Sequence, residues 1–371
     1  MENKRTPELL KQLQSLPLDA KVAMTKRRIR EFYTNTTIGY GNAYVSFSGG
    51  KDSTVLLHIA RQLYPDIPAV FVNTGLEYPE IQSFAKRQDN VTVVRPKMQF
   101  SEVISRYGYP LISKEVAESI RGARAMSATT GNVMRQRKKL QGKQEDYNGQ
   151  FCLEKWLPLS EVPVKMSQDC CRVMKKNPGK KYTKESKLHA ITATMADESR
   201  LRKLAWMRTG CNAFDGKIRS APMSFWTEQD VLRYIVQNDL EICSVYGDVV
   251  AVDELGNEYD PKGLLMDGCR LRCTECQRTG CIFCAYGVHR DRGETSFQRL
   301  AKTHPRQYEY CMRGGQWVDN PQYDPTAPTY DGEWKNWNPK KIFVPSKECL
   351  GLKTVFDMVN AIYGKDFYRY D

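Results

Sequence analysis

The sequence predicts an α/β protein in which a parallel β-sheet carries helices on both faces and a cysteine-rich segment is added to it. Three observations lead to this prediction. Short apolar runs alternate with stretches of helical periodicity, a glycine-rich segment joins one such run to a helix, and five cysteines fall within residues 269–284. Alternating strands and helices are typical of parallel sheets, because each crossover helix returns the chain to the starting edge.

The individual elements follow from the spacing of apolar residues, which alternate in strands and repeat every three or four positions in helices. The predicted strands cover residues 43–47, 69–73, 91–95 and 189–194. The predicted helices cover residues 8–34 (one or two helices), the stretch that begins at Lys51, 101–107, 113–126, the stretch that begins near Trp226 with Thr227 and Asp230 as its cap, and 350–363.

The segment Ser48–Ser53 reads Ser-Gly-Gly-Lys-Asp-Ser and lies between a predicted strand and a predicted helix. Two glycines let the backbone approach an anion, and the helix start adds the positive end of its dipole. Lys51 supplies a full charge, the two serine hydroxyls are donors, and Asp52 is a hard oxygen ligand for Mg²⁺. The spacing is not that of a P-loop, because Asp52 follows the lysine. These residues predict a site for a nucleotide or another phosphate ester, the alternative being a polar surface turn.

Four segments, in order, resemble the motifs of the PAPS (phosphoadenosine phosphosulfate) reductase family. Ser48–Ser53 is similar to the PP-loop of the ATP-pyrophosphatase (adenine nucleotide alpha hydrolase-like) superfamily, whose members cut ATP between the α and β phosphates. Residues 69–79 resemble the family's second strand and turn, Asp197–Arg200 its later phosphate-side motif, and Trp226–Val231 its Trp-Thr-x-x-Asp-Val helix start. The resemblance runs, with interruptions, from about residue 43 to residue 310.

The resemblance implies that ATP, or PAPS or APS (adenylyl sulfate), binds with Mg²⁺ at the carboxyl ends of the strands. The implied catalytic residues are Lys51, Asp52 and Arg200, with Arg200 holding phosphate or sulfonate oxygens in a bidentate fork. An ion pair between Arg200 and Glu198 at the surface is the alternative. The other implied nucleotide-binding residues are Ser48, Gly49, Gly50, Ser53, Asn73, Thr74, Gly75, Glu77 and Asp197.

Composition and motifs together predict four parts along the chain. These are an N-terminal helical segment (1–41), a PP-loop nucleotide-binding domain (42–268), the cysteine-rich segment (269–310), and an aromatic loop with a C-terminal helix (311–371). Residues 114–168 are predicted to be a basic insertion in the second part, mobile around Thr129–Gly131 and Gln141–Gly149. Residues 312–345, rich in Gly, Pro, Asn, Trp and Tyr, are predicted to be a loop.

The bulk composition argues for a protein of the cytoplasm. The 371 residues are 41% hydrophobic, enough for a large core, yet no apolar run approaches the ~20 residues that cross a bilayer. The first residues lack the apolar core of a signal peptide. Twelve cysteines without an export signal indicate thiols, metal ligands or catalytic groups in a reducing compartment. We therefore expect a cytoplasmic protein with no membrane partner.

Positive charge is concentrated in one segment. The formal net charge is +13, and residues 114–187 hold 17 Lys and Arg against 8 Asp and Glu. Such a segment creates a field that attracts polyanions. The expected partner, besides the nucleotide, is therefore tRNA or DNA. The alternatives are a small anionic substrate alone, or a solvated surface without a function.

The cysteine spacing predicts a metal site, because Cys-x-x-Cys pairs place two sulfurs on one ion or cluster with little strain. The resemblance implies a [4Fe–4S] cluster, since one branch of the family uses a tandem Cys-Cys and a distant Cys-x-x-Cys. The matching residues are Cys170, Cys171, Cys281 and Cys284. The alternative is zinc on Cys273, Cys276, Cys281 and Cys284. In the cluster interpretation, Cys269 and one of Cys273 and Cys276 are left to carry sulfur.

Cys349 departs from the family pattern. PAPS reductases carry a Glu-Cys-Gly-Leu/Ile-His tail whose cysteine attacks the sulfonate sulfur, whereas residues 348–353 read Glu-Cys-Leu-Gly-Leu-Lys and run into a predicted helix. We therefore expect Cys349 to be an ordinary residue before a helix, the alternative being a nucleophile.

Three functions remain open from the sequence. The first is an enzyme that cleaves ATP between the α and β phosphates, adenylates tRNA or DNA, and transfers sulfur to it. The second is a reductase that converts PAPS or APS to sulfite with thioredoxin. The third is a nucleotide-dependent binding module. A sulfur or electron donor protein is a further partner in the first two.

Overall fold

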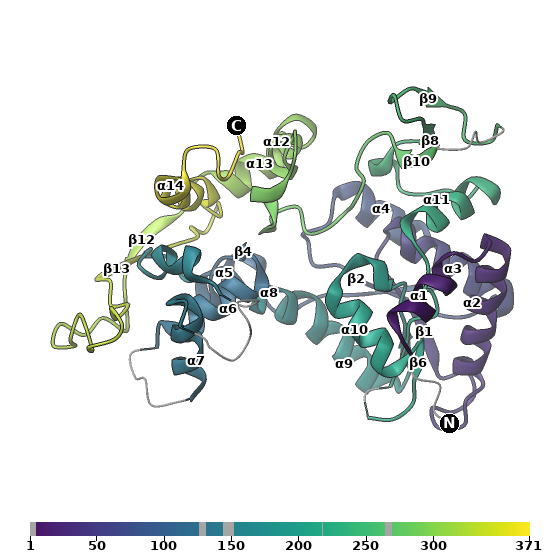
Figure 1. Cartoon of the computed structure of the whole chain (residues 1–371), viewed down its shortest axis with the longest axis horizontal. Coiled ribbons are helices and arrows are strands. Elements are labelled where there is room, and N and C mark those ends of the chain that lie inside the picture. The colour runs from purple at the N-terminus through teal and green to yellow at the C-terminus, as the bar shows by residue number, and fades with distance from the viewer. Residues whose placement is uncertain (1–4, 126–130, 144–151, 217, 264–268) are drawn as a thin grey trace. The chain divides into compact units, whose positions relative to one another are not determined.

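The computed structural model describes residues 5–371 except 126–130, 144–151, 217 and 264–268 (Figure 1). The chain forms two compact units, each built from two stretches far apart in the sequence. Unit 1 comprises Met1–Arg95 and Asn177–Gly280, and unit 2 comprises Pro96–Lys176 and Cys281–Asp371. These units are defined by how densely residues contact one another, which does not test the four predicted parts along the chain. The predicted boundaries after residues 41, 268 and 310 therefore stay predictions.

Unit 1 is built on a six-stranded sheet in the order β3-β2-β1-β5-β7-β6. Its strands are β1 (Ala43–Phe47), β2 (Ala69–Val72), β3 (Val91–Val94), β5 (His189–Ile191), β6 (Asn212–Ala213) and β7 (Arg219–Ser220). All neighbours run parallel except β6, which pairs antiparallel with β7. All four predicted strands are present, and the predicted parallel α/β fold is confirmed.

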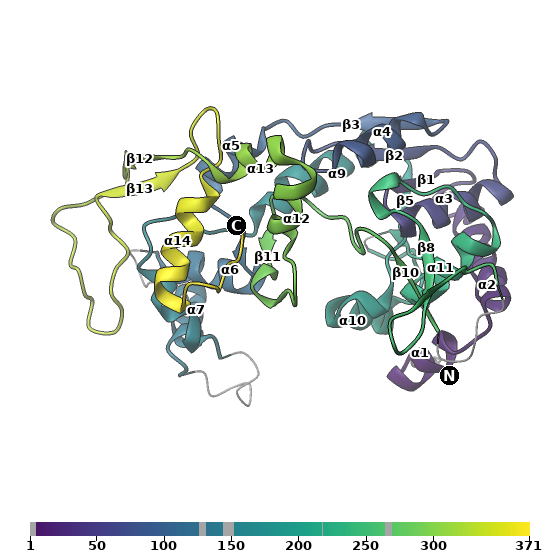
Figure 2. The same cartoon turned by 90° about the horizontal axis from the view of Figure 1, so that it is seen from above.

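Helices cover both faces of this sheet (Figure 2). They are α1 (Pro7–Gln14), α2 (Leu18–Tyr33), α3 (Lys51–Leu63), α4 (Pro79–Arg87), α9 (Asn177–Ser186), α10 (Arg200–Thr209) and α11 (Glu228–Gln237). α2, α3 and α11 pack against one another, and α9 lies against β2 and β3. α11 begins as predicted, because the Asp230 carboxylate accepts the N–H of Thr227 at 2.7 Å. The same carboxylate accepts a hydrogen bond from buried Lys21, which ties α2 to α11.

A second, three-stranded sheet of unit 1 was not expected from the sequence. β8 (Val249–Val252) lies between β9 (Glu258–Tyr259) and β10 (Arg270–Cys273), all antiparallel. These strands are too short to show a clear period of two. This sheet matters for the site because its last strand, β10, leads directly into residues 274–280. Residues of that segment contact the phosphate turn described below.

Unit 2 is mainly helical. Its helices are α5 (Phe100–Tyr107), α6 (Lys114–Ala123), α7 (Gly131–Leu140), α8 (Asp169–Cys171), α12 (Ser296–Thr303), α13 (Pro305–Met312) and α14 (Leu352–Tyr363), with a 3₁₀ segment η2 (Glu154–Ser160) and a π-helical turn η3 (Arg172–Lys176). β4 (Leu111–Ile112) pairs with β11 (Ala285–Tyr286) in parallel, and β12 (Gln316–Asp319) pairs with β13 (Lys341–Val344) antiparallel.

Unit 2 differs from the sequence-based expectation in two places. The predicted insertion at 114–168 contains a helix that was not predicted, α7, whose face with Val133, Arg137 and Leu140 is buried. The predicted loop at 312–345 pairs at its ends as β12 and β13. The expected mobility around Thr129–Gly131 and Gln141–Gly149 concerns mainly residues outside the described part of the chain.

Among the described residues, no helix is long and apolar enough to cross a membrane.

Candidate functional site

The predicted phosphate site is a tight turn between β1 and α3. Gly49 has a φ of +72°, and a Cβ atom there would lie 2.9 Å from Cγ2 of Ile81, so only glycine fits. Gly50 is the N-cap of α3 and has no side chain to cap it, and a Cβ atom on it would lie 3.2 Å from the Tyr246 hydroxyl. The start of α3 is thus directed at an incoming anion without a competing side-chain cap.

Hydroxyl groups hold the turn in shape. Oγ of Ser53 accepts the N–H of Ser48 at 3.1 Å, lies 3.0 Å from Oγ of Ser48, and donates to the carbonyl of Gly50 at 2.9 Å. The Thr54 hydroxyl donates to the same carbonyl at 3.1 Å. The two predicted serine donors therefore also build the turn, so a nucleotide meets a preformed cradle.

Lys51 lies at the first position of α3 and is only 4% exposed. Its ammonium group donates to Oε1 of Glu228 at 2.8 Å and to the carbonyl of Gln277 at 2.5 Å. Its backbone N–H donates to the hydroxyl of Tyr246 at 3.3 Å, and this hydroxyl lies 2.6 Å from Oγ1 of Thr279. Gln277 thus contacts the phosphate turn directly, and Thr279 contacts it through the hydroxyl of Tyr246.

Asp52 is a buried carboxyl group on which four charged residues of the site act. Burial raises the pKa of its carboxyl group to about 6, with Glu198 and Glu228 adding to the rise, and with Lys51 and Arg278 opposing it. Its Oδ1 atom is buried and has no hydrogen-bond partner among the described residues. A buried carboxylate oxygen without a partner is costly, and a divalent cation is the natural group to satisfy it. The residue therefore fits the predicted Mg²⁺.

The second predicted segment follows β2 and is a buried polar network. The Glu77 carboxylate accepts the N–H of Thr74 at 3.0 Å and its hydroxyl at 2.8 Å, and Asn73 accepts the N–H of Gly75 at 3.0 Å. Asn73, Thr74 and Glu77 are each at most 8% exposed. No heavy atom outside its chain neighbours lies within 4 Å of a Cβ built on Gly75, so this corner leaves room for a ligand.

The third segment, Asp197–Arg200, interacts electrostatically with the same site. Glu198 is among the groups that raise the pKa of Asp52, so it lies within electrostatic range of the turn. Glu198 pairs with Arg202 rather than with Arg200. Arg200 is exposed at the start of α10 and has no ion pair within the described structure, which leaves its guanidinium group available to an anion.

Sequence reasoning missed five residues of this site: Glu228, Tyr246, Gln277, Arg278 and Thr279. Glu228 lies within the recognised Trp226–Val231 motif but received no role. Their contacts with the turn span 195 and 226 positions of sequence, for Tyr246 and Gln277, and no local pattern encodes such a distance. The roles of the predicted site residues themselves stay predictions.

In unit 2 the fold brings two cysteine pairs towards each other. Cys170 and Cys171 lie in α8, which is anchored because Asp169 accepts hydrogen bonds from Arg121 at 3.1 Å and Arg172 at 2.8 Å. β11 follows Cys284 directly, and the hydroxyl of Tyr286 in β11 donates to the carbonyl of Ser167 at 2.9 Å. The segment after the second pair is thereby fastened beside the first pair.

The four sulfurs influence one another electrostatically. A hydrogen bond from the Cys170 thiol, with the field of Lys114 and two further lysines, lowers the pKa of Cys171. Both Cys281 and Cys284 contribute to the raised pKa of Cys170, after its bond to Cys171 and its burial. Within the described residues, however, no three His, Cys, Asp or Glu side chains are close enough to hold a metal ion. The four thiols fit a cluster by donor type and neighbourhood, and binding requires them to draw closer.

The cysteines of the zinc alternative divide between the units. Cys273 and Cys276 belong to unit 1, where both are buried. Burial raises the pKa of Cys273, and Lys51, Glu228 and Asp52 are among the charges that act on it. The Cys276 thiol donates to the carbonyl of Arg278 at 2.9 Å. This pair therefore lies beside the phosphate turn.

Cys349 is fixed in a turn ahead of α14. Its N–H donates to the hydroxyl of Ser346 at 3.0 Å, and its carbonyl accepts the N–H of Ser346 at 3.0 Å. A Cβ atom on Gly314 would lie 2.6 Å from Cβ of Cys349, so the backbone of residue 314 is packed against it. The residue is part of the folded body of unit 2, as its place before a helix predicted.

A parallel α/β sheet with a glycine turn, a lysine and a carboxylate at one helix start defines a nucleotide-binding protein of the PP-loop class. Residues 42–129 and 119–286 match the phosphoadenosine phosphosulfate reductase domain. The chain therefore belongs to the PAPS reductase family, as its motifs predicted.

Individual proteins are similar over parts of their length. Phosphoadenosine 5′-phosphosulfate reductase of Xanthomonas euvesicatoria pv. vesicatoria is 32% identical over 102 residues, which cover 26% of this chain and 38% of the reductase. Sulfate adenylyltransferase subunit 2 of Rhizobium tropici is 23% identical over 252 residues, which cover 62% of this chain and 65% of that protein. The chain thus matches less than two thirds of either relative. A crystal structure of PAPS reductase from Candida auris aligns with a TM-score of 0.32 at 13% identity, covering 65% of this chain and 90% of that one, which is too distant to carry an argument.

Proposed function

We propose that the chain is an enzyme that cleaves ATP between the α and β phosphates and adenylates a nucleic acid, tRNA or DNA, for sulfur transfer. The observation that carries the proposal is the unpartnered, buried Oδ1 of Asp52 beside Lys51. Reduction of a sulfonate leaves the phosphates intact and needs no cation at this turn. Cleavage of the anhydride releases pyrophosphate, whose charge a cation must balance.

The residues of the turn have separate tasks in this proposal. The amides at the start of α3 and the ammonium group of Lys51 bind the phosphate oxygens, and Arg200 holds the α phosphate in a bidentate fork. An oxygen of the acceptor attacks the α phosphorus while the bond to the β phosphate breaks and pyrophosphate leaves. Asp52 would hold Mg²⁺, which neutralises the leaving pyrophosphate. Asn73, Thr74, Gly75, Glu77 and Asp197 complete the nucleotide site.

The cysteines supply the second half of the reaction. Cys170, Cys171, Cys281 and Cys284 would hold a [4Fe–4S] cluster, and sulfur from a donor protein would be carried on a cysteine or delivered through this cluster. Sulfur delivered to the activated acceptor then displaces AMP. All twelve cysteines are free thiols, which supports a reducing compartment such as the cytoplasm.

Charge supports a polyanionic acceptor, although less strongly than the sequence alone suggested. Arg124, Arg137 and Lys139 are buried in unit 2, and Arg137 pairs with Asp331. Exposed cations remain in both units, including Lys138 on α7 and Lys180 on α9. These are the groups that would meet phosphates of tRNA or DNA.

Reduction of PAPS or APS to sulfite is the second candidate, favoured by the family and by one relative that is named a reductase. Its nucleophile would be Cys349, with thioredoxin as electron donor. Backbone hydrogen bonds place Cys349 in a turn within the folded body of unit 2, and residues 348–353 do not reproduce the Glu-Cys-Gly-Leu/Ile-His tail of the reductases, which disfavours this candidate. A nucleotide-dependent binding module is the remaining alternative.

Pyrophosphate and sulfite assays decide between these candidates. Anaerobically purified protein is incubated with Mg-ATP alone, with tRNA or with DNA, and separately with PAPS or APS plus reduced thioredoxin. We expect pyrophosphate from ATP, a higher rate with one nucleic acid, and a loss of about 100-fold or more in Lys51→Ala. Sulfite without ATP cleavage would overturn the proposal, and nucleotide binding without any product would indicate the binding module.

A further inference from the structure

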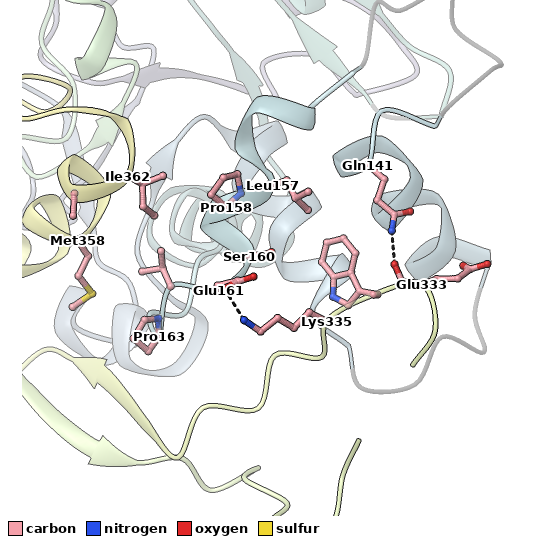
Figure 3. A pocket seen from close by; sticks show the side chains of 13 residues that line it. Gln141, Leu157, Pro158, Ser160, Glu161, Pro163, Glu333, Lys335, Met358 and Ile362 are labelled. Carbon is pink, nitrogen blue, oxygen red and sulfur yellow. Dashed lines mark hydrogen bonds and ion pairs between the residues drawn. The ribbon is translucent and has the colours of Figure 1, made fainter. Parts of the chain in front are cut away.

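Unit 2 contains a cavity of about 700 Å³ that shares no residue with the phosphate turn or the cysteine pairs (Figure 3). Its walls come from η2, the residues after it, α14, residues 333–335, and Gln141 just after α7, with Leu157, Pro158, Pro163, Met358 and Ile362 as apolar contributors. This volume lies within the range of small-molecule sites, and apolar walls with a few polar groups are their usual lining.

The wall at residues 159–164 is held from behind by a buried guanidinium group. Arg124 donates to the carbonyls of Leu159, Ser160, Val162 and Val164 at 2.6 to 3.1 Å. Its guanidinium carbon lies 4.5 Å from the ring centroid of Trp337, whose indole N–H donates to the Val162 carbonyl at 3.1 Å. The cavity is therefore a built feature, because this backbone is fixed by five hydrogen bonds from two side chains.

Another tryptophan, Trp334, belongs to the lining itself and has an indole N–H that is unpaired among the described residues. Trp334 is 3% exposed, and its indole N–H has no hydrogen-bond partner in the described part of the chain. An unpaired buried donor costs about 1–3 kcal/mol, so a ligand that brings an acceptor gains that amount on binding. By contrast, the indole N–H of Trp337, three residues further along the chain, does have a partner in the carbonyl of Val162.

The Trp334 nitrogen is itself buried, so a ligand in the cavity reaches it only after a lining side chain moves. The rim carries the pair of Lys335 and Glu161, with Nζ and Oε2 2.8 Å apart and side chains 64% and 57% exposed. Such an exposed pair contributes at most about 1 kcal/mol, so it opens easily. Gln141 donates to the carbonyl of Glu333 at 2.6 Å on the other side (Figure 3).

These features select the chemistry of the ligand. Apolar walls favour an uncharged ring, and the carboxylates of Glu161 and Glu333 at the rim disfavour an anionic group inside the cavity. An acyl chain would leave the Trp334 donor unsatisfied. A ring with a carbonyl acceptor fills the cavity and pairs the donor.

The neighbouring helix adds a preference for phosphate outside the cavity. Residues 131–143 contain Arg135, Arg137, Lys138, Lys139 and Lys143 and no acidic residue. Lys138 and Lys143 are exposed and flank Gln141, a lining residue. A neutral ring inside and phosphates outside describe a nucleotide or one unit of a polynucleotide.

We propose that this cavity binds a nucleobase through its carbonyl oxygen and the indole N–H of Trp334, with the attached phosphates on the exposed lysines that flank Gln141. The base comes either from a free nucleotide or from a nucleic acid strand. Recognition here is independent of ATP cleavage at the turn, so each can fail without the other.

The test reads the tryptophan directly. The full chain is labelled with 5-fluorotryptophan, which gives six ¹⁹F resonances, and Trp334→Phe assigns one of them. Uridine is expected to shift the Trp334 resonance saturably and to leave that of exposed Trp317 unchanged. Toluene, a ring without an acceptor, is the control probe. Equal binding of toluene, or no saturable shift with uridine, overturns the proposal.

Two variants separate the cavity from the rest of the surface. Ala361→Phe places a ring in the cavity and should weaken uridine binding about tenfold or more, whereas Arg306→Phe, at an exposed position of α13, should not. Unchanged binding in Ala361→Phe would contradict the proposal. Uridine monophosphate and hexauridylate distinguish the sources: tighter, salt-dependent binding of hexauridylate, reduced in Lys138→Gln/Lys143→Gln, assigns the base to a nucleic acid, and equal binding assigns it to a free nucleotide.

Discussion

The ammonium group of Lys51 lies 2.8 Å from Oε1 of Glu228, with the lysine side chain 5% and the glutamate side chain 39% exposed. A lysine at a phosphate turn is thus already paired with a carboxylate from the start of α11. Phosphate oxygens must take this ammonium group from Glu228 and from the carbonyl of Gln277 before they bind fully. Breaking these contacts therefore reduces the free energy that nucleotide binding releases.

Glu228→Gln is expected to tighten the binding of Mg-ATP about fivefold, because it removes the carboxylate that competes with the phosphates while keeping the shape of the side chain. The magnitude follows from the ~1 kcal/mol that a partly exposed ion pair contributes. Titration calorimetry measures the dissociation constant. Glu241→Gln, which breaks the exposed pair with Arg87, is the matched control and should change nothing. Weaker binding in Glu228→Gln would mean that this carboxylate assists the nucleotide, for example through the cation.

Asp52→Asn is expected to stabilise the ligand-free chain at neutral pH and to abolish pyrophosphate formation. Burial raises the pKa of Asp52 to about 6, above its value of about 3.9 in an unfolded chain, so the folded state holds the proton more tightly. Its contribution to stability is present below about pH 4 and is lost as the pH rises through 6. At pH 8 the variant should therefore gain about 1–3 kcal/mol in the free energy of unfolding.

Urea unfolding at pH 4 and pH 8 measures this difference, and the gain should appear only at the higher pH. Asp66→Asn, at an exposed position after α3, serves as the control. Wild-type affinity for Mg-ATP should also fall below about pH 6, since a protonated carboxyl group is a poor Mg²⁺ ligand. Equal stability of Asp52→Asn and wild type at pH 8 would show that the carboxylate is already satisfied.

The phosphate turn could be predicted from the sequence because its determinants are local. Two glycines, a lysine and an aspartate between a strand and a helix specify the same geometry wherever they occur, and Gly49 has the positive φ that this requires. Tyr246 and Thr279 could not be predicted, because they reach the turn through tertiary packing of residues 244–279. The motifs therefore identified the phosphate turn itself but not the residues of 244–279 that pack against it.

Basic residues show a different limit of sequence reasoning. Charge suggested that the cations of residues 114–168 face solvent, yet Arg124 is buried with four carbonyl partners, and desolvation lowers its pKa to about 9. Arg137 is buried against the carbonyls of Ala123 and Ala125 and the carboxylate of Asp331. A guanidinium group has five donors, so backbone carbonyls can satisfy it without any signal in the local sequence.

Cys171→Ser is expected to remove the iron–sulfur chromophore of anaerobically purified protein. The wild-type chain should be brown with a broad absorbance near ~400 nm, from a cluster on Cys170, Cys171, Cys281 and Cys284. The hydrogen bond from Cys170 and the nearby lysines lower the pKa of Cys171, which favours the thiolate form that a cluster ligand needs. Cys152→Ser, at an exposed cysteine outside both pairs, should keep the colour. A colourless wild type with stoichiometric zinc, lost in Cys273→Ser, would establish the zinc alternative instead.

Cys349→Ser is expected to retain full pyrophosphate formation and full sulfur transfer. Three hydrogen bonds join the backbone of Cys349 to Ser346, and its turn packs against the backbone of Gly314, so the residue lies in the folded body of unit 2 and not in a free reductase-type tail. Serine preserves the size and polarity of the side chain, so the turn should fold unchanged, which circular dichroism and thermal unfolding check. The assay measures pyrophosphate from Mg-ATP and sulfite from PAPS in parallel for wild type and variant. If wild type forms sulfite and the variant forms none while its stability is unchanged, Cys349 is a nucleophile, and the chain is a reductase that uses its thiol from within a turn instead of from a free tail.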